Sequence, residues 1–186
     1  MKKAICKLKS IGPYSQSRHV EIEKKSKELS ADYEKRTWRE RCHTTDDGYI
    51  FIPPMQFANS IKNAAKILNI SIQGQGKATY TKNFEAGVLV TDGIKLPITK
   101  EEMIGEWVFV PSDGRRGGTT RVMKCFPLIK EWKGEIIYYI FDDTITEDIF
   151  YQVIRASGEL IGIGRFRPRN WGYYGRFEVE SIKWIE

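Results

Sequence analysis

The chain has 186 residues and carries 30 lysines and arginines against 24 acidic residues, a formal charge of +6. Hydrophobic residues make up 41% of it, enough for a core, which excludes general disorder, and the length favours one domain, residues 1–186. No apolar run approaches the ~18 residues of a membrane span. Three scattered cysteines predict reduced thiols in an intracellular protein, without disulfides or a zinc site.

The N-terminal part predicts one strand followed by a long polar stretch. Loose alternation over residues 3–11 indicates a strand that ends at the turn Gly12-Pro13. The first 41 residues hold twelve basic and six acidic residues, whereas the rest of the chain holds eighteen of each. The whole charge excess is therefore N-terminal, and we expect residues 14–47 to run over the surface as a basic excursion.

The clearest helix is expected to begin at Pro53-Pro54, after a short strand over 49–52. Apolar residues recur at helical spacing from Phe57 to Leu68, and Asn69 fits the end of the helix. Proline suits the first turn because its missing N–H would be unsatisfied there. A flexible basic loop is expected over 73–82.

The second half predicts mainly strands, with one further helix. Strands are expected at 84–90, 107–110, 119–129, 135–141 and 177–185. Thr146 is expected to cap the helix, and Gly158 to end it in a left-handed conformation. Strands mixed with two well-separated helices predict an α+β fold, with both helices on one face of an antiparallel sheet.

The most informative segment is the Gly-rich loop, residues 162–177, which holds four glycines and four arginines but no acid. Glycine exposes backbone N–H groups to an anion, arginine offers a planar fork to phosphate, and aromatic rings stack on unpaired bases. The residues expected to contact nucleic acid here are Gly162, Gly164, Arg165, Arg167, Arg169, Trp171 and Arg176. The alternative is a structural loop with solvated arginines and buried aromatic rings. Because the segment follows a helix and precedes a strand, it is not a dinucleotide-binding motif.

This segment resembles the signature loop of the RAMP superfamily, the repeat-associated RNA-binding proteins of CRISPR systems. Gly158 leads into the Gly-rich loop and then into a Gly-Arg-Phe strand, and residues 51–64 resemble the strand-proline-helix entry of the family. Pro54 departs from the pattern, which usually has glycine there. A basic, serine-rich turn, residues 15–18, follows the first strand in the expected order.

The resemblance implies a modified RRM or ferredoxin-like palm with insertions near 14–47 and 111–140. The chain is most similar to the backbone subunit that lines CRISPR RNA in effector complexes. The resemblance also implies a phage or prophage protein in the cytoplasm of a bacterial host. RNA would lie across the palm, against the Gly-rich loop and the first helix. This implies contacts from Ser17, Arg18, Asn59 and Lys62.

Two further basic groups are weaker candidates. Arg115 and Arg116 are expected at a hairpin tip that resembles the thumb-like hairpin of the family, where it could reach a neighbouring subunit. Lys77 lies in the loop 73–82. A solvated turn explains Arg115 and Arg116 equally well, and a bare mobile loop explains Lys77 better than contact with nucleic acid does.

Catalytic candidates are few, and no metal or cofactor is expected. His19 lies near the position where metal-independent ribonucleases of the superfamily carry a histidine, and His43 is the only other histidine. Adjacent acids are explained by turns and helix starts. We therefore expect a non-catalytic protein that binds single-stranded nucleic acid, RNA rather than DNA, and oligomerises along the strand. A metal-independent endoribonuclease and an anti-defence protein that docks on a host CRISPR complex remain the alternatives.

Overall fold

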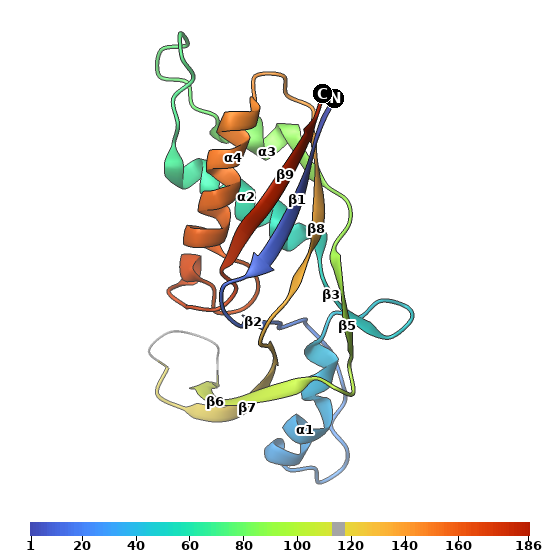
Figure 1. The fold of residues 1–186 in the computed structure, drawn as a ribbon. Helices are drawn as coiled ribbons and strands as arrows, with labels where there is room; N and C mark the ends of the chain where they lie inside the picture. The colour runs from blue at the N-terminus through green and yellow to red at the C-terminus, as the bar shows by residue number, and fades with distance from the viewer. Residues whose placement is uncertain (113–117) are drawn as a thin grey trace.

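The computed structural model describes residues 1–112 and 118–186. Its centre is an antiparallel sheet of four strands in the order β4-β8-β1-β9, covered on one face by helices (Figure 1). The four strands are β1 (Lys2–Ser10), β4 (Val88–Val90), β8 (Lys133–Ile140) and β9 (Phe177–Ile185). The main helices are α2 (Pro54–Leu68) and α4 (Glu147–Ala156). We call this sheet with its helices the palm.

The chain passes through the palm in the order β1-α2-β4-β8-α4-β9. With the sheet order above, this is the β-α-β-β-α-β arrangement of ferredoxin-like folds. The expected α+β fold with an antiparallel sheet and two main helices is confirmed.

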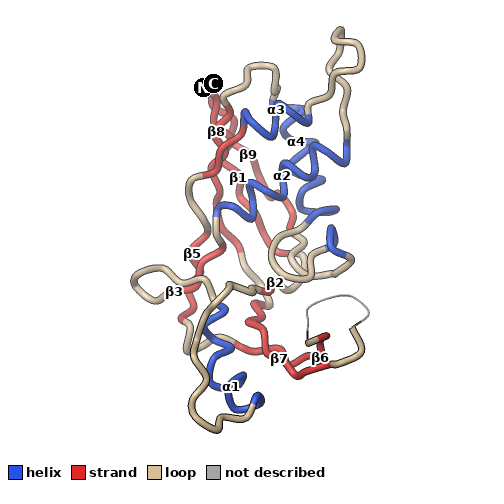
Figure 2. The backbone as a smooth tube through the Cα atoms, turned by 180° about the vertical axis from the view of Figure 1, so that it is seen from behind, coloured by secondary structure: helices blue, strands red, loops and turns tan. Residues whose placement is uncertain are grey.

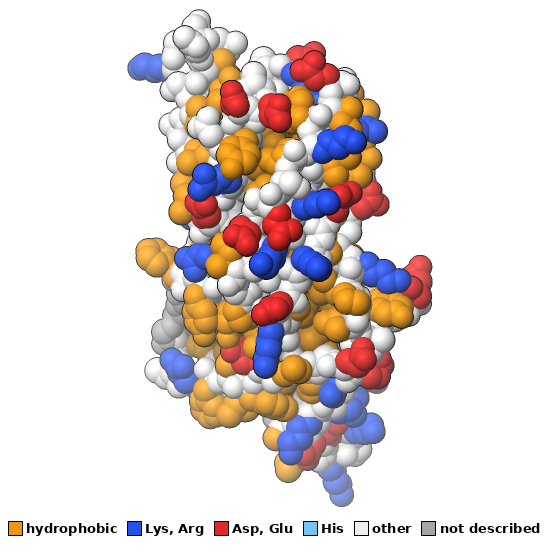
Figure 3. Space-filling view, viewed as in Figure 1, with side chains coloured by type: hydrophobic (Ala, Val, Ile, Leu, Met, Phe, Trp, Pro, Cys, Tyr) orange, Lys and Arg blue, Asp and Glu red, His pale blue; other side chains and the backbone are white. Residues whose placement is uncertain are grey.

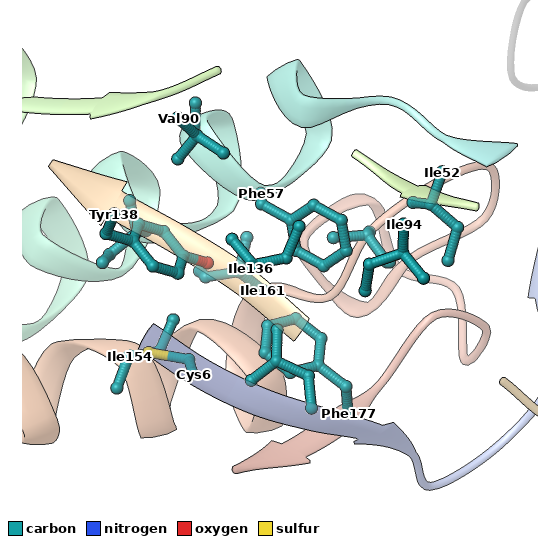
Figure 4. Packing of buried hydrophobic residues seen from close by; sticks show 14 of the residues in the cluster. Cys6, Ile52, Phe57, Val90, Ile94, Ile136, Tyr138, Ile154, Ile161 and Phe177 are labelled. Atoms are coloured by element: carbon teal, nitrogen blue, oxygen red, sulfur yellow. The ribbon is translucent and has the colours of Figure 1, made fainter. Parts of the chain in front are cut away.

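Side-chain alternation explains how the sheet and helices form one core. Ala4, Cys6 and Leu8 of β1 are fully buried on the helix side, whereas Lys7 and Lys9, which alternate with Cys6 and Leu8, are exposed. The rings of Phe57 from α2 and Phe177 from β9 meet at 6.1 Å in this core (Figure 4). The helices therefore cover only one face of the sheet.

The ends of the helices test the capping predictions. Asn69 follows α2 in a left-handed conformation with φ 48°, as its position predicts, and Thr146 Oγ1 accepts a hydrogen bond from the Ile149 N–H of α4. Gly158 does not end α4, because the chain continues through a π-helical turn, η2 (Ser157–Ile161), and Gly162 takes the positive φ of 70°. A Cβ at Gly158 would lie 2.0 Å from the Phe177 carbonyl oxygen, so this glycine serves close packing.

Two long segments leave the palm and build a lower layer. Residues 11–53 contain β2 (Tyr14–Ser15), α1 (Ser30–Thr37), the short helix η1 (Trp38–Arg41) and β3 (Tyr49–Ile52). Residues 91–132 contain β5 (Ile94–Thr99), β6 (Ile104–Pro111) and β7 (Arg121–Ile129). They form the sheets β2-β7-β6 and β3-β5, below the palm in Figure 2.

Three sequence predictions need correction here. Residues 84–87 belong to the helix α3 (Thr81–Gly87), and only Val88–Val90 pairs as a strand. Residues 133–140, placed in the second insertion, form the palm strand β8. The polar stretch 14–47 contains α1, which a weak apolar pattern concealed. None of the helices in the described chain combines the length and apolar character that a bilayer span requires.

Candidate nucleic-acid interface

A pocket of about 350 Å³ opens between the Gly-rich loop and the first turns of α2. It brings together residues that the sequence places in three separate segments. The predicted residues that line it are Ser17, His43, Asn59, Gly162, Gly164, Arg165 and Arg167. Segments from the first and last quarters of the sequence therefore meet at one site, which we call the loop pocket.

Backbone hydrogen bonds tie the N-terminal segment to the Gly-rich loop. The Gly175 N–H donates to the Pro13 carbonyl oxygen at 2.7 Å, and the Arg165 N–H donates to the Ser15 carbonyl oxygen at 2.8 Å. Gly164 makes this approach feasible, because a Cβ there would lie 2.5 Å from that same Ser15 oxygen. The glycines thus bring the loop close to its own chain, which is the structural role that the alternative interpretation of the loop gives them.

Arg165 lines the pocket, but its guanidinium already has partners. Its Nη2 lies 2.7 Å from Oε2 of Glu106 in β6, and its Nε donates to Ser15 Oγ at 3.1 Å. The Cζ atom lies 3.9 Å from the ring centroid of Phe126 in β7. The charge that the acid-free window suggested for this residue is therefore largely neutralised by a glutamate from the β6–β7 hairpin.

The other arginines of the loop differ in position. Arg167 lines the pocket and donates from Nη1 to the Gly164 carbonyl oxygen at 2.9 Å, while Arg169 is exposed. Neither forms an ion pair with a carboxylate of residues 1–112 or 118–186. Arg176 lies outside the pocket lining, where its Nε donates to the Glu159 carbonyl oxygen at 3.1 Å. Arg167 and Arg169 thus remain the best candidates for phosphate contacts.

Aromatic rings lie beside these arginines. Phe166 and Tyr173 are 42% and 60% exposed, and their ring centroids are 5.3 Å apart in an edge-on arrangement. Trp171 is 82% exposed, at a left-handed φ of 62°. Such exposed ring faces beside cationic side chains are typical of surfaces that stack on unpaired bases.

The remaining candidates lie around or away from the pocket. Arg18 is exposed just beyond Ser17 and outside the lining, and Lys62 is half-buried further along α2. Lys77 follows the far end of α2, which is ~22 Å long at 1.5 Å per residue, so the helix separates it from the pocket. Arg115 and Arg116 lie outside the described residues.

The two histidines have different surroundings. His43 lines the pocket, and burial together with the charge of Arg18 lowers its pKa below the ordinary value, so its ring is neutral near pH 7. His19 is exposed, with its Nε2 3.4 Å from Glu21 Oε1. Of the two, only His43 shares the site with the Gly-rich loop. The described ranges contain no group of three or more potential metal ligands.

Sequence reasoning missed several residues of the pocket. Gln56 and Ser60 line it from α2, and Asn170 lines it from the Gly-rich loop. Gln56, Asn59 and Ser60 are three and four positions apart, which places them on one side of the helix. A search for polar residues at helical spacing in the first turns of α2 would have found this face.

The face of the molecule shown in Figure 3 carries basic, acidic and apolar side chains intermixed. Of the six excess positive charges in the first 41 residues, four are the lysines of β1 in the palm, and two come from residues 11–41, which include α1 at the lower end of the molecule in Figure 1. From the first 41 residues, Ser17 alone lines the pocket. Local geometry at the Gly-rich loop, rather than total charge, thus defines the candidate site.

Comparison with known proteins supports the fold. No protein-family model matches the chain, and no curated protein matches it. One matching solved structure is a chain from a cryo-EM structure of the type III-B Cmr-beta bound to cognate target RNA, with a TM-score of 0.53 and 12% identity. The match covers 100% of this chain and 61% of that chain. This likeness shows a shared fold, in agreement with the RAMP-like architecture that the sequence predicts.

Proposed function

We propose that the protein binds single-stranded RNA in a CRISPR-related role, with the strand passing through the loop pocket. One observation carries this proposal: residues predicted from three separate segments of the sequence line one pocket, namely Ser17, Asn59, Gly162, Gly164 and Arg167. The solved structure with the same fold, described as bound to cognate target RNA, supports RNA over DNA. The protein acts as a binding subunit without catalysis of its own.

The binding mode follows from the chemistry around the pocket. Arg167 and Arg169 contact phosphates, because their charges are not neutralised by a carboxylate among the described residues. Phe166 and Tyr173 offer exposed rings to bases. Most of these contacts ignore base identity, so the affinity depends on salt because counterions leave the strand on binding.

Anisotropy of a fluorescent RNA oligomer across a salt series tests this mode. The double variant Arg167→Ala, Arg169→Ala should weaken binding and reduce the slope of log affinity against log salt by about 1.4, which corresponds to two lost phosphate contacts on a single strand. The charge-matched control is Lys66→Ala, Lys77→Ala, at the other end of α2. Binding that ignores salt, or an equal loss in both double variants, would contradict the proposal.

His43 favours one second candidate function, a metal-independent endoribonuclease. Its neutral ring lines the pocket and is suited to accept a proton from a ribose 2′-hydroxyl. Incubation with RNA in the presence of a chelator compares wild type with His43→Ala and with His19→Ala, the exposed control. Cleavage that His43→Ala abolishes and His19→Ala retains would establish the enzyme, and absence of cleavage in wild type would remove it.

Self-association, docking and origin stay predictions. If the protein oligomerises along a strand, the mass of its complexes should increase stepwise with RNA length in light scattering. If it docks on a host CRISPR complex, a protein partner should remain after nuclease treatment of a pull-down. A phage or prophage origin is implied by the sequence resemblance alone.

A further inference from the structure

A buried network of three polar side chains reaches the loop pocket through one of its lining residues, Gln56. Tyr14 and Gln16 are fully buried, and Gln56 extends from α2 into the pocket lining. The Tyr14 hydroxyl donates to Gln56 Oε1 at 2.9 Å, and Gln16 Nε2 donates to the Tyr14 oxygen at 3.3 Å. Buried polar groups destabilise a core unless they form hydrogen bonds. A network of such bonds therefore fixes the orientation of the side chains that take part in it.

Backbone groups fix the direction of every hydrogen bond in this network. The His43 N–H can only donate, and it donates to Gln16 Oε1 at 2.8 Å. The amide of Gln16 therefore presents Nε2 to the Phe51 carbonyl oxygen at 2.8 Å and to Tyr14. The Tyr14 oxygen accepts this bond, and its proton is left for Gln56. The orientation of the Gln56 amide thus follows from two backbone groups.

Gln56 is consequently a donor with a fixed orientation. Its carbonyl oxygen is held by Tyr14, while its amide nitrogen forms no hydrogen bond to any other described residue. A free glutamine can present either its donor or its acceptor to a ligand, as it does when it reads adenine with both. The N–H groups of this glutamine have no partner among the described residues, whereas its oxygen already accepts one hydrogen bond, so the group it offers first to a ligand is a donor.

The size of the pocket suits one unit of a nucleic-acid strand. Its volume of about 350 Å³ lies at the lower end of the ~300–1,000 Å³ range of small-molecule sites. Arg167 lines the same pocket, so a phosphate at Arg167 would leave the attached base near the polar side of α2. A single unpaired nucleotide matches both the volume and the chemistry.

We propose that the loop pocket accepts one unpaired base and that Gln56 selects a base with a carbonyl oxygen against adenine. Among RNA bases adenine alone lacks a carbonyl oxygen. Guanine carries one on C6, where adenine has its amino group, and uracil carries one at the equivalent place on its Watson–Crick edge, so a donor that faces this position meets an acceptor in guanine and uracil but another donor in adenine. This inference rests on the proposed RNA binding and adds base preference at one position. Tyr14 is a positioning residue, because it acts on the base only through Gln56.

Oligo-adenosine and oligo-inosine of equal length provide a matched pair of probes. Inosine replaces the amino group of adenosine by a carbonyl oxygen, and a homopolymer presents the same base in every register. Wild type should bind oligo-inosine about threefold to tenfold more tightly, as expected for one additional hydrogen bond. Measurements in lithium buffer avoid strand association of inosine.

Three variants separate base reading from general binding. Gln56→Leu should reduce the preference to about one, and Tyr14→Phe should also lower it, because the amide can then turn either way. Gln152→Leu, at an exposed glutamine of α4, should retain the preference. Thermal melting checks that each variant is folded. If Tyr14→Phe does not fold, the preference measured for Gln56→Leu alone tests whether Gln56 distinguishes inosine from adenosine.

The outcomes distinguish this inference from the proposed function. Tight, salt-dependent binding of both oligomers with equal affinity would leave RNA binding intact and overturn base reading. A preference that survives Gln56→Leu would overturn it as well. If wild type binds neither oligomer, the proposed function fails and base reading fails with it.

Discussion

Two arginines lie against the same aromatic ring, and each pairs with a glutamate from another element. The Cζ atoms of Arg41 and Arg165 lie 5.3 and 3.9 Å from the ring centroid of Phe126. Arg41 pairs with Glu34 of α1, and Arg165 pairs with Glu106 of β6. The two centres have the same chemistry, but only the second lines the loop pocket.

Their surroundings differ in depth and in the number of donors. The Glu34 side chain is 1% exposed and also receives hydrogen bonds from Lys124 Nζ at 3.0 Å and from the Cys125 N–H at 2.8 Å. The Glu106 side chain is 23% exposed and is held by Arg165 and the Tyr174 hydroxyl. The first centre fastens α1 to β7, whereas the second fastens the β6–β7 hairpin to the Gly-rich loop at the site itself.

The largest expected effect is the loss of the buried centre. Glu34→Ala leaves Arg41 and Lys124 without their carboxylate and the Cys125 N–H without an acceptor, so we expect a loss of about 3–5 kcal/mol in the free energy of unfolding. Chemical denaturation measures this loss. Glu106→Ala should cost less, because water can reach the charge that remains. Equal losses would show that depth does not distinguish the two centres.

Glu106→Gln should separate stability from binding. The substitution removes the charge that neutralises Arg165 and leaves an oxygen for the Tyr174 hydroxyl, so Arg165 becomes available to phosphate. We expect about threefold to tenfold tighter RNA binding and a salt slope that steepens by about 0.7. Glu34→Gln is the control and should leave the affinity unchanged. Tighter binding in both variants, or in neither, would contradict the view that Glu106, but not Glu34, keeps an arginine from binding RNA.

Acid should weaken the buried centre. Burial opposes ionisation of Glu34, but the hydrogen bonds from Arg41, Cys125 and Lys124 outweigh it and hold the pKa below its ordinary 4.5. Because the folded pKa is depressed, this stabilisation is present above about pH 4.5 and is lost as the pH falls through the folded value. The stability difference between wild type and Glu34→Gln should therefore shrink between pH 7 and pH 3. A difference that stays constant would contradict this assignment.

The smallest effect is expected at an exposed pair of the same chemistry. Arg155 and Glu159 lie 3.0 Å apart on one helical face, with side chains 54% and 48% exposed. Arg155→Ala should leave unfolding and RNA binding unchanged, because water screens the pair. A measurable loss of stability would mean that the chemistry of an ion pair, rather than its burial, determines how much each of the three pairs contributes.

Local sequence patterns predicted much of the fold and many residues of the candidate site. Helical periodicity with Pro54 and Asn69 determined α2, and alternation determined β1 and β9. Such signals are local, because one element creates them whatever packs against it. Composition alone identified the Gly-rich loop, and two of its four glycines, Gly162 and Gly164, line the pocket. The resemblance added Ser17 and Asn59, which line the same pocket.

Tertiary structure decided which of those groups are available to a ligand. Glu106 lies 59 positions from Arg165 along the chain, so no local window could reveal that it neutralises one of four arginines. The role of Gln56 depends on Tyr14, 42 positions away, and on a backbone N–H at His43. The sequence by itself determined the main helices and the first and last strands of the palm and indicated the candidate site, because periodicity and composition are local properties. Only the folded chain determined the charge and the hydrogen-bonding direction at the site, because both depend on partners that folding brings together.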